Sequence, residues 1–103
     1  MATEPQNYLV RCDPATAELL RSEIKKATGA DPRQSDMKGI GGNTELILFG
    51  TAALGALKAL LDVVKASIET GRAIKGIKIG GREVNNPTAT QIAELQRQTG
   101  EAR

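Results

Sequence analysis

One apolar stretch at the centre of the chain limits what this sequence can fold into. Residues 51–69 read TAALGALKALLDVVKASIE, and their charged side chains are Lys58, Asp62, Lys65 and Glu69. This spacing places all four charges in one line along an α-helix, which has 3.6 residues per turn. The rest of the surface is apolar or small, whereas an ordinary surface helix has one apolar face. We therefore expect a helix over 51–69 with two packing partners, one of them a β-sheet.

The apolar surface of this helix divides into two stripes. The bulky stripe contains Leu54, Leu57, Leu61, Val64 and Ile68, and the small stripe contains Ala52, Ala56, Ala59, Val63 and Ala66. The small stripe has two interpretations. It can be core, as most apolar helix faces are, or it can be a surface for association, because small side chains let two backbones approach closely. The residues of the candidate interaction surface are Ala52, Gly55, Ala56, Ala59 and Val63.

Length and composition indicate a small single domain in a reducing compartment. The chain has 103 residues, a net charge of +2 and one cysteine, Cys12. A single cysteine forms no intrachain disulfide and suits the cytoplasm. We expect a lead-in at 1–6 without signal-peptide character, a domain at 7–100 and a tail at 101–103. Lys58 and Asp62 interrupt the longest apolar run, so no membrane span is expected.

The first half of the chain predicts a strand, a helix and a connector. Residues 8–12 are a strand, and Asp13-Pro14 then marks the start of a helix that runs to about residue 28 and is capped by Gly29. Leu19 widens its predicted buried face. Residues 30–36 are polar and predict a connector with a turn at Asp31-Pro32, and 38–44 predict a flexible glycine-rich stretch.

Residues 45–49 are an apolar run too short to distinguish a strand from a helix by periodicity. Gly50-Thr51 resembles a break followed by an N-cap, which favours a strand there. The second half predicts a hairpin of strands 73–79 and 82–84 around Gly80-Gly81, and then a helix that begins with a capping box at Thr88 and Gln91. Its buried residues are Ile92 and Leu95. The expected fold is α+β, with a three- or four-stranded sheet packed by the long central helix and two shorter helices.

The sequence carries no catalytic signature. It has no histidine, no pair of carboxylates stands out, and Cys12 lies in an apolar strand, where a buried thiol is expected. The glycines of 39–42 lack the Lys-Ser/Thr ending of a phosphate loop and the last glycine of the dinucleotide fingerprint. We therefore expect a protein that is not an enzyme and that holds no cofactor or metal.

The order of elements in the second half resembles a known family. The Ala/Leu-rich helix GTAALGALKALLDVV, the hairpin IKGIKIGGREV and the short helix after it are similar to the effector-associated constant component proteins of bacterial conflict systems. The first half, NYLVRCDPATAELLRSEI, is compatible with the same family, although Val63-Val64-Lys65 stand where its members have a Trp and a basic run. The resemblance implies a small non-enzymatic component that docks, assembles or regulates variable effectors.

Two functional hypotheses follow. The favoured one is a cytoplasmic protein-interaction adaptor or self-assembling component. It would dock a protein partner or a second copy through the part of its central helix that the sheet leaves uncovered, together with the segment from Leu46 to Phe49. The alternative is a nucleic-acid or nucleotide-binding domain. It would use the basic hairpin residues Lys75, Lys78 and Arg82 together with the glycine-rich loop at 39–42.

Overall fold

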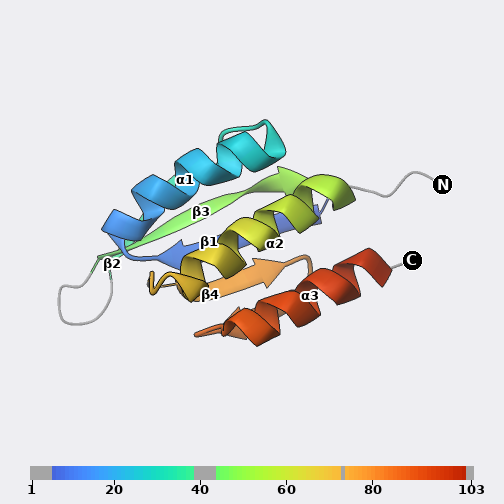
Figure 1. Cartoon of the computed structure of the whole chain (residues 1–103). Helices are drawn as coiled ribbons and strands as arrows, with labels where there is room; N and C mark the ends of the chain where they lie inside the picture. The colour runs from blue at the N-terminus through green and yellow to red at the C-terminus, as the bar shows by residue number, and fades with distance from the viewer. Residues whose placement is uncertain (1–5, 39–43, 73, 102–103) are drawn as a thin grey trace.

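The computed structural model describes residues 6–38, 44–72 and 74–101 (Figure 1). Outside the described residues lie 1–5 of the predicted lead-in at 1–6, 39–43 of the predicted glycine-rich stretch at 38–44, residue 73, and 102–103 of the predicted tail at 101–103. The strands are β1 Gln6–Cys12, β2 Arg33–Lys38, β3 Thr44–Ala52, β4 Ile74–Ile79 and β5 Arg82–Asn85. The helices are α1 Pro14–Thr28, α2 Leu54–Glu69 and α3 Ala89–Glu101.

The five strands form one antiparallel sheet in the order β2-β3-β1-β4-β5. The first six elements follow the order βαββαβ, which is the split-βαβ or ferredoxin-like arrangement. The hairpin partner β5 and the helix α3 extend it. All three helices lie against one face of the sheet, with α2 between α1 and α3 (Figure 1). The predicted α+β class is confirmed, and the predicted strand number is too low.

Local signals in the sequence explain the outer helices. The Asp13 carboxylate accepts a hydrogen bond from the backbone N–H of Thr16 at 3.2 Å, and Gly29 ends α1 in the left-handed conformation with φ of 78°. At α3, Thr88 and Gln91 form the reciprocal bonds of the predicted capping box, at 2.9 and 3.2 Å. The Gly80-Gly81 hairpin turn is also as predicted.

The central helix begins later than predicted. It starts at Leu54, and its N-cap residue Ala53 makes no side-chain hydrogen bond, so the predicted N-cap at Thr51 is wrong. Residues 50–52 continue β3, because they pair with Tyr8, Asn7 and Gln6 of β1. Pairing with the neighbouring strand outweighs the local glycine-threonine signal. The preference for a strand over 45–49 is confirmed.

The predicted connector over 30–36 is also wrong in part. Arg33–Lys38 is the edge strand β2, which pairs along its length with β3. Gln34 and Asp36 are both exposed, so the strand lacks the apolar alternation that marks a half-buried strand. A polar edge strand of this kind also resists pairing with other chains. Leu19, predicted to widen the buried face of α1, is 52% exposed.

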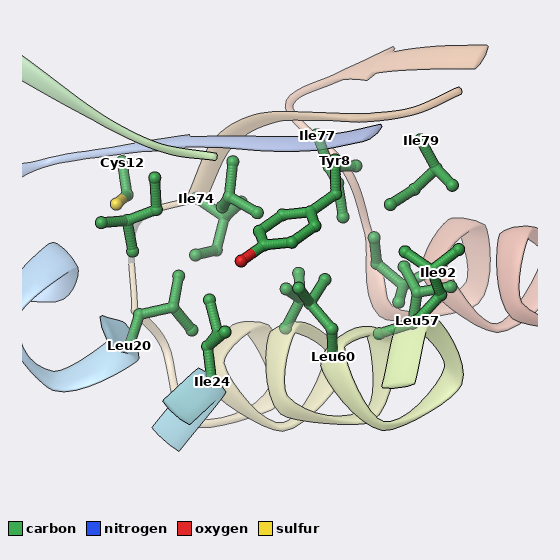
Figure 2. Close-up of a cluster of buried hydrophobic side chains, with 14 of the residues drawn as sticks. Tyr8, Cys12, Leu20, Ile24, Leu57, Leu60, Ile74, Ile77, Ile79 and Ile92 are labelled. Atoms are coloured by element: carbon green, nitrogen blue, oxygen red, sulfur yellow. The ribbon is translucent and has the colours of Figure 1, made fainter. Parts of the chain in front are cut away.

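The core lies between the sheet and the helices (Figure 2). From the sheet it receives alternate residues such as Tyr8, Val10 and Ile77, and from α2 it receives Leu57, Leu60, Leu61 and Val64. The predicted burial of Ile92 and Leu95 in α3 is confirmed, at 0% and 4% exposed. Neither predicted stripe included Leu60, which is fully buried. The helix has one core-facing side and two flanks that contact α1 and α3.

Replacing glycine by alanine at two positions, Gly50 and Gly55, tests this packing. A Cβ at Gly50 would lie 2.8 Å from the hydroxyl oxygen of Tyr8, whose ring is 4% exposed, whereas a Cβ at Gly55 meets nothing within 4 Å. We expect Gly50→Ala to lower the free energy of unfolding by about 1–3 kcal/mol because it overpacks the core. Gly55→Ala should raise it by about 0.4–1 kcal/mol by restricting the unfolded chain. Urea denaturation measures both, and equal effects would contradict the described contact between Tyr8 and Gly50.

Candidate functional site: the open face of the sheet

The sheet has one face that the helices do not cover. Side chains alternate between the two faces of a strand, and along β1 Tyr8, Val10 and Cys12 are buried while Leu9 and Arg11 are half-buried. In β4, Ile77 and Ile79 are buried and Lys78 is exposed. Leu9, Arg11 and Lys78 therefore lie on the face that points away from the helices. We call this the open face.

The register of the strands places one residue of each strand side by side across the open face. Leu9 of β1 lies between Phe49 of β3 and Lys78 of β4. Phe49 in turn pairs with Arg33 of β2, and Lys78 pairs with Glu83 of β5. These five residues form a line that we call the cross-strand row, in the order Arg33, Phe49, Leu9, Lys78, Glu83. It has an apolar centre, a cation on each side of that centre, and an anion at the β5 end.

A second line of residues runs beside the cross-strand row. Ile47 of β3 pairs with Arg11 of β1, and Arg11 pairs with Gly76 of β4. The side chain of Arg11 crosses Gly76 and donates a hydrogen bond to Asn85 of β5 at 2.7 Å. A Cβ at Gly76 would lie 2.5 Å from the Arg11 guanidinium, so the absence of a side chain there makes this path possible. Arg11 is thus held by the protein itself.

The open face is hollowed around the cross-strand row. The hollow has a volume of about 710 Å³, and its lining includes Leu9, Arg33, Phe49 and Lys78. At one end the Thr51 hydroxyl donates to the Asn7 side-chain oxygen at 2.8 Å. At the rim Asp31 is bound by Arg21 at 2.9 Å, and this hydrogen bond and charge lower the pKa of the Asp31 carboxyl. The floor of the hollow is therefore apolar, and its rim is polar.

Arg33 differs from the other arginines of the described chain. Arg11, Arg21, Arg72, Arg82 and Arg97 each bond to a side chain, respectively of Asn85, Asp31, Glu23, Gln98 and Glu94. Arg33 has no hydrogen bond or ion pair to any described residue, and it is exposed at the start of β2. Its guanidinium group is therefore available to an anionic partner from outside the chain.

The predicted interaction surface does not form one exposed helix face. Ala52 belongs to β3 and is 8% exposed, while Ala56 and Val63 are partly buried against the core. Ala59 is half-buried, and Gly55 is the one member of the five that is exposed. These placements favour packing within the chain for most of the small stripe. On the other flank of α2, Gln96 of α3 donates hydrogen bonds to the Asp62 carboxylate at 2.7 Å and to the Lys58 carbonyl at 2.9 Å.

The three residues of the predicted anion site are also separated. Lys78 lies on the open face, but Arg82 lies on the helix side of the sheet and bonds to Gln98 of α3. Lys75 is the extra residue of a β-bulge, because Cys12 pairs with Ile74 and Arg11 with Gly76. The glycine-rich loop lies outside the described residues. Lys78 is thus the only one of the three that contributes to the cross-strand row.

Leu9 and Arg33 were missed by sequence reasoning, whereas Phe49 lies in the 46–49 segment that the docking hypothesis included. One signal was present, since Leu46, Ile47, Leu48 and Phe49 are consecutive apolar residues. In a strand such a run makes both faces apolar, and only one of them can face the helices. Arg33 carried no signal, because its strand was not predicted.

The described residues contain no group of three or more side chains suited to hold a metal ion. Cys12 is fully buried, and burial together with the nearby Asp13 and Glu45 carboxylates raises the pKa of its thiol from 9.0 to about 12. The expected buried thiol is confirmed.

Within the described part of the chain, no helix has both the length and the apolar character needed to cross a bilayer. Comparison with protein-family models, curated proteins and solved structures found no match.

The buried thiol predicts a loss of stability at alkaline pH. An unfolded thiol ionises near pH 9, whereas the folded Cys12 thiol stays protonated up to about pH 12. The contribution of the protonated thiol to the free energy of unfolding is therefore fully present below pH 9. It is lost as pH rises towards 12, at up to about 1.4 kcal/mol per pH unit. Denaturant unfolding at pH 8, 10 and 11 measures the free energy of unfolding, which should fall more steeply with pH for the natural protein than for Cys12→Ala. Parallel slopes would show that Cys12 is not buried as described.

Proposed function

We propose that this protein is a non-catalytic, self-assembling interaction component whose copies dock through the open face of the sheet. The observation that carries the proposal is the apolar centre of that face, formed by Leu9, Ile47 and Phe49. These side chains are half-buried by their neighbours within the chain, and the helices are all on the other side. A second protein layer over the open face would remove the remaining apolar surface from water.

Packing of one sheet on another is a common way to cover such a face. Two sheets stack about 10 Å apart, and the side chains of their facing sides interdigitate. The hollow around Leu9 and Phe49 offers space for side chains of a docking partner. Arg33, Lys78 and Glu83 would then lie around the apolar centre as a charged rim, which is the usual anatomy of an interface.

The open face is better suited to docking than the exposed side of α2. The flanks of α2 are covered by α1 and α3, and its exposed positions include Gly55, Lys58, Asp62 and Ala66. Two of these four carry charge, and the other two offer little apolar area. The open face instead presents two branched aliphatic side chains and an aromatic ring.

The resemblance to effector-associated constant component proteins supports the same class of function. It implies a component that docks or assembles effectors in a bacterial conflict system, and docking requires a surface rather than a catalytic centre. We propose the cytoplasm as the site of this role, because the free thiol of Cys12 suits a reducing compartment.

The proposal predicts self-association that depends on Phe49. Light scattering on a size-exclusion column should show a particle heavier than a monomer as protein concentration rises. Phe49→Asp should yield a folded monomer, because assembly of this variant would bury an unpaired carboxylate at the centre of the interface. Gly55→Arg is the matched control: it adds a charge at an exposed position of α2 and should leave the mass unchanged. A natural protein that stays monomeric, or loss of assembly in Gly55→Arg alone, would overturn the proposal.

A second candidate function is the binding of single-stranded nucleic acid on the same face. The observation that favours it is the position of Phe49 between Arg33 and Leu9, with Lys78 next in the row. An aromatic ring can stack on a base while cations contact the phosphates.

This second candidate predicts a salt-dependent affinity for short oligonucleotides. Fluorescence anisotropy with a labelled single strand should show binding that weakens steeply between 50 and 200 mM salt in roughly the manner of other phosphate contacts. Phe49→Ala and Lys78→Gln should each weaken it, whereas Lys58→Gln on α2 should not. Absence of binding at low salt would remove this candidate and leave protein docking.

A further inference from the structure

We infer that the partner of the open face is a second copy of this chain, related by a two-fold axis that runs along β1, and that Arg33 of each copy lies against Glu83 of the other. This inference rests on the proposed function and adds to it the relative orientation of the two copies. It follows from the order of charges in the cross-strand row.

The position of β1 determines which residues would face each other. β1 is the middle strand of five, with β3 and β2 on one side and β4 and β5 on the other. A two-fold rotation about an axis along β1 places β2 of one copy over β5 of the other, and β3 over β4. This rotation does not shift residues along the strand direction, so the two cross-strand rows lie over each other. Arg33 therefore faces Glu83, Phe49 faces Lys78, and Leu9 faces Leu9 of the second copy.

Each of these three contacts is favourable. An arginine and a carboxylate form a charge-assisted hydrogen bond that can be bidentate, and Arg33 has no competing partner among the described residues. A lysine ammonium over a phenylalanine ring is attracted by the electrons of the ring face. The two Leu9 side chains meet at the axis as an apolar centre. Because the interface uses the same patch twice, every contact away from the axis occurs twice.

A two-fold axis at right angles to the strands, along the cross-strand row, is unfavourable. An axis along the cross-strand row would place each residue of the row over its own counterpart. Arg33 would face Arg33, Lys78 would face Lys78 and Glu83 would face Glu83, which opposes like charges at three positions. Of these two axes, the distribution of charge favours the one along β1.

The second line of residues is compatible with this arrangement. Ile47 of one copy would lie over the strand position of Gly76 in the other, where the Arg11 side chain crosses the glycine. An isoleucine can pack on the aliphatic part of an arginine side chain. Arg11 points away from the axis towards Asn85, which separates the two Arg11 charges. Aligned sheets cross at about 30°, an offset that the long Arg33 and Glu83 side chains can span.

Charge reversal tests the orientation directly. Arg33→Glu and Glu83→Arg should each weaken self-association on the order of tenfold, because each replaces two attractive contacts per dimer by two repulsive ones. An equimolar mixture of the two single variants should associate again, since every contact between unlike copies is then complementary. Sedimentation velocity at a series of concentrations measures all of these constants. Both residues are exposed, so the fold is expected to tolerate the changes.

The outcomes separate this inference from the proposed function. Glu18→Arg, a charge reversal on the exposed side of α1, is the matched control and should not change the association constant. Recovery in the mixture and not in either variant alone supports the two-fold arrangement. If Phe49→Asp abolishes association and the mixture stays as weak as the single variants, the arrangement is wrong and the proposed function stands. If the natural protein does not associate, the proposed function fails and this inference fails with it.

Discussion

The structure depends on a sheet that is covered on one side only. All three helices pack on the same face, where α2 presents Leu57, Leu60, Leu61 and Val64 to the strands and lies between α1 and α3. This single layer of helices buries the central members of one set of alternating side chains, among them Tyr8, Val10 and Ile77. The same alternation sends the other set, including Leu9 and Phe49, to the face without helices. Helices on one side of the sheet alone therefore leave an apolar open face on the other side.

The middle strand connects the two faces. Tyr8 and Cys12 of β1 belong to the core, and between them Leu9 and Arg11 belong to the open face. The Tyr8 ring requires a glycine beside it at Gly50, and Arg11 requires a glycine beside it at Gly76. Each glycine gives space to a large side chain of β1, one on each face. The packing on both faces thus depends on the glycines Gly50 and Gly76, which lie beside β1.

Much of the fold could be predicted from the sequence, because its signals were local. The Asp13 cap, the Thr88 capping box and the Gly80-Gly81 turn each act within a few residues and were identified. The start of α2 and the strand β2 were not, since both depend on pairing with β3 across the sheet. The cross-strand row could not be predicted for the same reason. Its five residues come from five strands, and only the register brings Arg33, Phe49 and Lys78 together.

The central claim is that a second copy covers the open face, and intermolecular nuclear Overhauser effects between labelled and unlabelled copies test it most directly. A mixed dimer in which one copy carries ¹³C should show contacts from the Leu9 and Ile47 methyl groups to Phe49 or Leu9 protons of the unlabelled copy. Contacts from α2 alone, or no intermolecular contacts at concentrations where the protein is dimeric, would contradict the account.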